Sequence, residues 1–209
     1  MATKQLERKK IYDPIQRLIH AGIGLLVLGL IVLGLVSRGM EPGAAKQGLV
    51  RIHLIFGYGL TLGLVARMVW GVLGPHHARL SELWRPADWW ARVRGSQRKG
   101  EAGFGHNPFA CLVYIMFYAS LLLSIVSGLA LAGMEHDRGP LAALLFDDLR
   151  WQSMFLWLHE AMLYLMIVFV LVHISAIVRH EETAAYPVAQ SMLSGYQYRP
   201  VSSEETHDD

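Results

Sequence analysis

The chain has 209 residues and a single cysteine, Cys111, which lies inside an apolar run. One cysteine excludes an internal disulfide, an iron–sulfur cluster, a thiolate zinc site and the C-x-x-C-H attachment of a c-type haem within the chain. Any metal-containing cofactor must therefore be held by other side chains, and the ten histidines are the main stock of metal ligands.

Charge is also scarce, because only 17% of the residues are charged and 53% are hydrophobic. This composition is unlike that of a water-soluble domain and favours a protein surrounded by membrane lipid. The formal net charge of +2 is too small for the concentrated basic face that nucleic-acid binding requires. We therefore expect no nucleic-acid partner.

Four apolar runs are long enough to cross a bilayer, since about twenty helical residues span roughly 30 Å of hydrocarbon. We expect helices at about 15–37, 48–74, 108–133 and 153–179. A cleaved signal peptide is an alternative for the first run, which follows basic residues but exceeds the usual length of a signal core. The fold class is thus all-α, an integral membrane four-helix bundle formed by a single domain at 1–195.

Basic residues are distributed unevenly between the two sides of this bundle. Thirteen lie in the N-terminal segment, the connection 75–107 and the C-terminal tail, against five in the other two connections. By the positive-inside rule, this difference predicts that both termini are cytoplasmic. Residues 196–209, which end in several acidic residues, are expected to form a polar cytoplasmic tail.

Four histidines lie inside the apolar runs: His20, His53, His159 and His173. The last two share the fourth run, and their spacing of fourteen puts them within about 40° of one helix face and roughly 21 Å apart. Alternating helix directions place His20 at the depth of His173, and His53 at the depth of His159. We therefore predict His20 and His173 as ligands of a cytoplasmic-side haem iron, and His53 and His159 as ligands of a periplasmic-side haem iron. Two occupied axial positions favour electron transfer over substrate binding at iron.

Other roles for these histidines stay open at this point. Polar side chains often hydrogen-bond between membrane helices, and membrane histidines also serve in proton relays. Zinc is a further alternative, although two histidines at each depth do not complete a tetrahedral shell.

Several further residues are candidates for contact with the cofactor. Arg17, Arg51 and Arg67 are candidate partners of haem propionates. The first two could equally anchor helix ends at the interface, whereas Arg67 lies deep enough to need a partner. His106, just before Asn107-Pro108, is a candidate contact for a quinone head group or a propionate, although a helix start explains part of that motif.

Small residues follow the histidines of the first two helices: Gly22, Gly24, Gly57, Gly59 and Gly63. They either leave room for a porphyrin or allow two helices to approach closely.

These residues resemble the bacterial di-haem cytochrome b family that includes the membrane subunits of nickel-iron hydrogenases. The resemblance covers about residues 11–195, and the paired histidines of the fourth helix are its most specific part. The motifs that carry it are Arg17-Leu18-Ile19-His20, Arg51-Ile52-His53 with Gly57-Tyr58, Arg67-Met68-Val69-Trp70-Gly71 leading to Gly74-Pro75-His76, Gly105-His106-Asn107-Pro108, Ser127-Gly128-Leu129 at the end of the third helix, Leu158-His159-Glu160 and Val172-His173.

The resemblance implies two haem b groups in a multi-pass protein of the bacterial inner membrane. It implies electron transfer between the quinone pool and a periplasmic redox partner, either a c-type cytochrome or a hydrogenase-like module, with quinone as a candidate substrate. A stand-alone superoxide:quinone oxidoreductase is an alternative, in which Arg51 would attract the anion. An alternative of another class is a non-redox membrane scaffold or transporter. The sequence predicts no particular oligomeric state.

Overall fold

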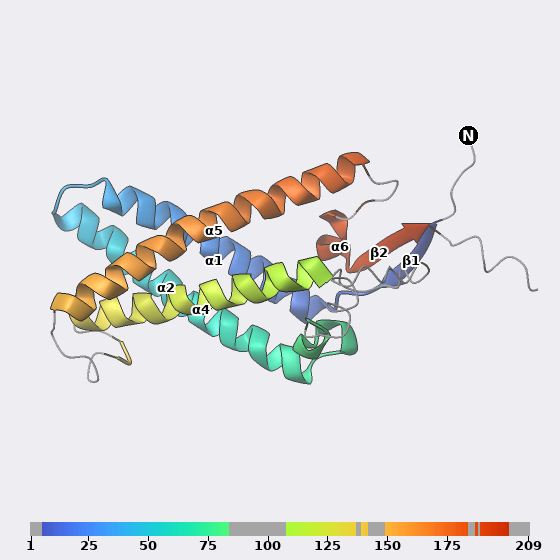
Figure 1. Ribbon diagram of the computed structural model, residues 1–209, viewed down its shortest axis with the longest axis horizontal. Helices are drawn as coiled ribbons and strands as arrows, with labels where there is room; N and C mark the ends of the chain where they lie inside the picture. Colours follow the sequence, from blue (N-terminus) through green and yellow to red (C-terminus); the bar gives the residue numbers. More distant parts are fainter. Residues whose placement is uncertain are drawn as a thin grey trace, which may run out of the picture.

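The computed structural model describes residues 6–83, 108–136, 139–141, 149–183, 187 and 189–200. The four long helices are α1 (Pro14–Arg38), α2 (Ala44–Leu73), α4 (Pro108–His136) and α5 (Leu149–Thr183). The shorter elements are the 3-10 helices η1 (His76–Ala78) and η2 (Leu80–Leu83), helix α6 (Ala189–Ser194), and strands β1 (Leu6–Lys10) and β2 (Tyr196–Pro200). Successive long helices run in opposite directions along one bundle (Figure 1).

All four long helices are long and apolar enough to cross a membrane. Large apolar side chains such as Leu18, Leu62 and Leu171 are exposed on the outside of the bundle, where lipid rather than water would surround them. The all-α, four-helix prediction is confirmed, and the observed helix ends lie within four residues of the predicted ones. The chain is a multi-pass membrane protein.

Asp13 determines where α1 begins. Its Oδ1 accepts hydrogen bonds of 3.0 Å from the backbone amides of Ile15 and Gln16, and Pro14 follows it at the first helical position. Such a cap satisfies amides that have no partner within the helix. Its Oδ2 also accepts a bond of 3.2 Å from Trp70 Nε1, which ties the start of α1 to the end of α2.

The four long helices pack as two hairpins, which we name the N-terminal hairpin (α1 and α2) and the C-terminal hairpin (α4 and α5). Contacts within each hairpin are extensive, whereas contacts between the hairpins are few. A small buried core joins them: Ile23, Val27, Leu60, Leu64, Leu121, Ile125 and Met166. A cavity lined by residues of both hairpins lies beside this core.

Glycine makes the close approach within the N-terminal hairpin feasible. A Cβ on Gly63 would lie 3.1 Å from Ile23, and one on Gly59 would lie 3.4 Å from Leu26. These two glycines therefore serve helix contact. Gly22, Gly24 and Gly57 differ, because a Cβ there would meet nothing within 4 Å in the described structure.

A two-stranded antiparallel ribbon joins the two ends of the chain. Strand β1 pairs with β2 so that Leu6 lies opposite Pro200 and Lys10 opposite Tyr196. The ribbon lies at one end of the bundle, next to α6 (Figure 1). The sequence did not predict it, because residues 196–200 were assigned to the polar tail.

Gly195 makes the turn between α6 and β2. Its φ of +88° is favourable only for glycine, and its amide donates to the Ser191 carbonyl at 2.8 Å to close the helix. Its carbonyl accepts from the amides of Ile11 and Tyr12 at 3.0 and 3.1 Å. This single residue thus connects the end of α6 to the segment that follows β1.

Candidate functional site

One histidine pair, which we name the terminal pair, lies toward the end of the bundle that carries the ribbon. It consists of His20 from α1 and His173 from α5, whose ring centroids are 6.3 Å apart with an interplanar angle of 55°. The two rings come from different hairpins. The terminal pair therefore lies between the N-terminal and the C-terminal hairpin.

The second pair, which we name the distal pair, lies toward the opposite end of the bundle. It consists of His53 from α2 and His159 from α5, whose ring centroids are 6.2 Å apart with an interplanar angle of 72°. The structure thus contains the same two histidine pairs that the sequence predicted from the depth of each histidine in the membrane. Ligation of iron by these rings stays a prediction.

Both pairs have the dimensions that a shared iron requires. A metal bound between two imidazole nitrogens at about 2.0 Å each keeps the ring centroids roughly 6 Å apart. The donor set also fits, because neutral imidazole is the usual axial ligand of haem iron. Within the described residues, the buried Nδ1 of His53 has no hydrogen-bond partner, although a buried imidazole nitrogen normally needs one.

A cavity of about 220 Å³ lies beside the distal pair. All four long helices contribute to its mostly apolar wall, which includes His53, His159, Gly57 and Gly128. Apolar walls with a few placed polar groups are typical of cofactor sites. Because Gly57 lines this cavity and a Cβ there would meet open space, it leaves room next to the histidine pair.

His159 is held in a defined orientation by helix α4. Its Nδ1 lies 3.1 Å from the Ser124 carbonyl and 3.0 Å from Ser127 Oγ. A carbonyl can only accept, so Nδ1 carries the proton and the Nε2 lone pair is left for a metal. Ser127 belongs to the Ser127-Gly128-Leu129 motif, but its contact with His159 was not predicted from the sequence, and Ser124 was not singled out. The available signal was a Ser-x-x-Ser spacing that puts two hydroxyls on one face of an otherwise apolar helix.

The terminal pair is held by aromatic side chains instead. The Phe169 ring is 5.8 Å from His173 and nearly parallel to it, at 9°. Phe117 from α4 stacks in turn on Phe169 at 4.3 Å. Within the described residues, neither His20 nor His173 has a hydrogen-bond partner.

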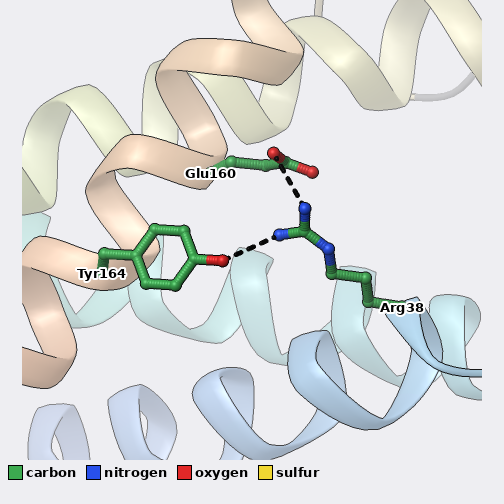
Figure 2. A network of polar contacts seen from close by, with 3 residues as sticks. All are labelled: Arg38, Glu160 and Tyr164. Atoms are coloured by element: carbon green, nitrogen blue, oxygen red, sulfur yellow. Dashed lines mark hydrogen bonds and ion pairs between the residues drawn. The ribbon is translucent and has the colours of Figure 1, made fainter.

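A polar network joins α1 to α5 at the level of the distal pair. Arg38 forms an ion pair of 3.4 Å with Glu160 and donates a hydrogen bond of 3.2 Å to the Tyr164 hydroxyl (Figure 2). Glu160 directly follows His159, so the network attaches the end of α1 beside a candidate ligand. The sequence analysis did not single out Arg38 or Tyr164; a cation at the end of one apolar run and a carboxylate inside another were the available signal.

Arg67 is buried, with 8% of its surface exposed, and it has the partner that its depth predicted. Its Nε donates to the Tyr118 hydroxyl at 3.0 Å and its Nη1 donates to the Ala78 carbonyl at 3.1 Å. Both acceptors are neutral. The contact of Arg67 with a haem propionate stays a prediction.

The remaining candidates lie in three different settings. Arg17 donates to the last three carbonyls of α6, at the ribbon end of the bundle. Arg51 is exposed and lines a second cavity of about 420 Å³, together with Lys46 and Glu135, which adjoins the cavity of the distal pair. His106 lies outside the described residues.

Paired histidines at two depths of a four-helix membrane bundle define a class of protein, the membrane b-type cytochromes. The family model for the prokaryotic cytochrome b561 matches residues 11–195, which is most of the chain. The chain belongs to this family, as the sequence motifs predicted. It is therefore an electron-transport protein with haem b as its cofactor.

Three similar proteins are named probable Ni/Fe-hydrogenase B-type cytochrome subunits. The protein from Azotobacter vinelandii is 28% identical over 75% of this chain and 73% of its own length. The protein from Cupriavidus necator is 27% identical over 75% and 72%, and the one from Escherichia coli K12, whose name specifies hydrogenase 1, is 24% identical over 76% and 75%. No solved structure matches the chain.

Proposed function

We propose that this protein is a di-haem cytochrome b that transfers electrons between the quinone pool and a periplasmic redox partner. The observation that carries the proposal is the presence of two histidine pairs, at separations of 6.3 and 6.2 Å, at two depths of one bundle. Two pairs of this geometry, each with two imidazoles, suit two six-coordinate haems.

His20 and His173 would hold one haem, and His53 and His159 the other. Each bound haem b supplies a one-electron couple between ferric and ferrous iron. Two histidines at each site would leave a bound iron no open position for a substrate, so the chain's residues favour electron transfer over chemistry at the metal. The spacing of fourteen positions from His159 to His173 separates the two sites by roughly 21 Å along α5.

Basic side chains near the distal pair suit the carboxylates of a haem. Arg51 and Lys46 lie in the cavity that adjoins the distal pair, and a guanidinium can bind a carboxylate through two parallel hydrogen bonds. Arg67 keeps donors beyond its two bonds and is our candidate near the other end of α2. Arg17 is a weaker candidate, because its donors already bind α6; His106 stays our candidate for a quinone head group or a propionate.

Both termini are cytoplasmic in this proposal, because the basic residues gather on that side of the bundle. The terminal pair then lies near the cytoplasm of the bacterial inner membrane and the distal pair near the periplasm. The names of the relatives support a hydrogenase-like module as the periplasmic partner. A c-type cytochrome is the other partner to test.

The test uses the purified full chain in vesicles, with decylubiquinol as electron donor and a soluble c-type cytochrome as acceptor. We expect the donor to reduce both haems and electrons to reach the acceptor. His53→Ala should remove the distal haem and slow reduction of the acceptor at least tenfold, whereas the control Thr183→Ala, at the exposed last residue of α5, should have no effect. Electron transfer by His53→Ala at the wild-type rate would overturn the proposal.

A further inference from the structure

The two histidine pairs are held by different kinds of contact. His159 of the distal pair donates through Nδ1 to the Ser124 carbonyl and Ser127 Oγ, whereas His173 of the terminal pair is stacked on Phe169. Hydrogen bonds to the far nitrogen of a ligand histidine change how strongly it donates electrons, and stacking on a phenylalanine does not do so to the same degree.

Ser127 is well placed to accept a hydrogen bond from His159. Its side chain is completely buried, and its hydroxyl proton is directed to the Leu123 carbonyl at 2.7 Å. Because that proton is engaged, the Oγ lone pairs remain for Nδ1–H of His159 at 3.0 Å. Consecutive hydrogen bonds polarise one another, so the bond from Ser127 to the Leu123 carbonyl makes Ser127 Oγ a stronger acceptor for His159.

Gly128 lets the imidazole reach these acceptors. A Cβ at this position would lie 3.0 Å from Cε1 of His159, which is closer than ordinary contact allows. Any larger residue would push the ring away from α4 by a few tenths of an ångström. Ser124, Ser127 and Gly128 therefore form one surface of α4 against which His159 rests, and we name these three residues the histidine seat.

We propose that the histidine seat is a positioning site that lowers the reduction potential of the distal haem. The proposal rests on the function proposed above. Hydrogen bonds to Nδ1–H make the ligand more basic, and a more basic ligand stabilises ferric over ferrous iron. The same bonds fix which nitrogen faces His53. The terminal pair has no such bonds within the described residues, so the seat separates the potentials of two otherwise similar sites.

The first test compares Ser127→Ala with Ser120→Ala in the full haem-loaded protein. Both serines are buried in α4 and donate to the carbonyl four residues earlier, but only Ser127 contacts a histidine. Loss of one acceptor should shift the oxidised-to-reduced equilibrium of the distal haem about threefold to tenfold toward reduction, which is about 28 to 59 mV for one electron. Redox titration followed by visible absorption measures this shift, and His53→Ala identifies which haem is distal.

Gly128→Ala provides a second variant that keeps both acceptors but moves the ring. We expect it to change the electron paramagnetic resonance g-values of the distal ferric haem and to leave those of the terminal haem unchanged. Loss of the distal haem from Ser127→Ala or Gly128→Ala, with both haems retained in Ser120→Ala, would also support the proposal that the histidine seat positions His159.

The proposal is overturned if Ser127→Ala and Gly128→Ala leave both potentials and both g-values as in the wild type. It is equally overturned if Ser120→Ala produces the same shift as Ser127→Ala. A wild-type protein that binds no second haem would instead contradict the proposed function, so the two failures are distinguishable.

Discussion

At the scale of single residues, two arginines show how burial determines how much a hydrogen bond stabilises the fold. Arg67 and Arg38 both donate to a tyrosine hydroxyl, at 3.0 Å to Tyr118 and at 3.2 Å to Tyr164. Arg67 is buried, whereas half of the Arg38 side chain is exposed and can exchange its partner for water or lipid head groups. The hydrogen bond to a tyrosine should therefore contribute more to the free energy of unfolding at Arg67 than at Arg38.

Replacing each tyrosine with phenylalanine tests this difference. Tyr118→Phe removes an acceptor from a buried guanidinium and should lower the free energy of unfolding by about 1 to 3 kcal/mol. Tyr164→Phe should cost less than about 1 kcal/mol, because exposed polar contacts of charged groups contribute little. Thermal unfolding in detergent, followed by circular dichroism, measures both. Equal losses in the two variants would contradict the assigned role of Arg67.

At the scale of elements, the end of α6 depends on a side chain from α1. Arg17 donates to the carbonyls of Met192, Leu193 and Ser194, which belong to the last turn of α6, where carbonyls have no amide partner within the helix. The turn at Gly195 and the start of β2 follow directly. We infer that Arg17 stabilises the attachment of the ribbon to the bundle.

Arg17→Ala should therefore loosen the ribbon. We expect faster hydrogen exchange at the amides of Ile11 and Tyr12, which donate to the Gly195 carbonyl. Lysine should not restore protection, because one ammonium cannot reproduce the planar set of donors that binds several carbonyls. Gln47→Ala, far from the ribbon in the second cavity, serves as the control. Wild-type exchange in Arg17→Ala would show that the ribbon is held by other contacts.

The long helices could be predicted from sequence because the bilayer fixes their length and their apolar composition. The juxtaposition of His53 with His159 followed from alternating helix directions, which need no knowledge of packing. The ribbon could not be predicted, because Leu6–Lys10 and Tyr196–Pro200 are polar, short and far apart in the chain. The contacts of Ser124 and Ser127 with His159 could not be predicted for a similar reason, because they depend on which face of α4 meets α5.

At the scale of the whole molecule, both histidine pairs connect the N-terminal hairpin to the C-terminal hairpin. His20 and His53 belong to the first hairpin, and their partners both belong to α5. The direct contacts between hairpins are few. Haem bound at these pairs would therefore act as a cross-link that holds the bundle together.

Haem depletion should consequently destabilise the protein. A ligand at 100 times its Kd adds about 2.7 kcal/mol to the free energy of unfolding, and each site would contribute such an increment. Protein made in haem-deficient cells should therefore have a clearly lower Tm and faster proteolysis than protein made with haem. A non-redox scaffold or transporter would fold equally well in both, and that result would contradict the cross-linking role.

The topology of the whole molecule makes a separate prediction. With both termini cytoplasmic, green fluorescent protein fused after residue 209 should fluoresce, and alkaline phosphatase fused there should be inactive. Alkaline phosphatase inserted near residue 41, between α1 and α2, should be active because that connection would face the periplasm. The reverse pattern would place the distal pair at the cytoplasmic side.

The most direct test of the central claim is the haem content of the purified chain, measured as haem b per polypeptide together with four histidine variants. We predict two haems per wild-type chain. His53→Ala and His159→Ala should each lose the same haem, and His20→Ala and His173→Ala should each lose the other. One haem per chain, or variants that do not fall into these two pairs, would contradict the account.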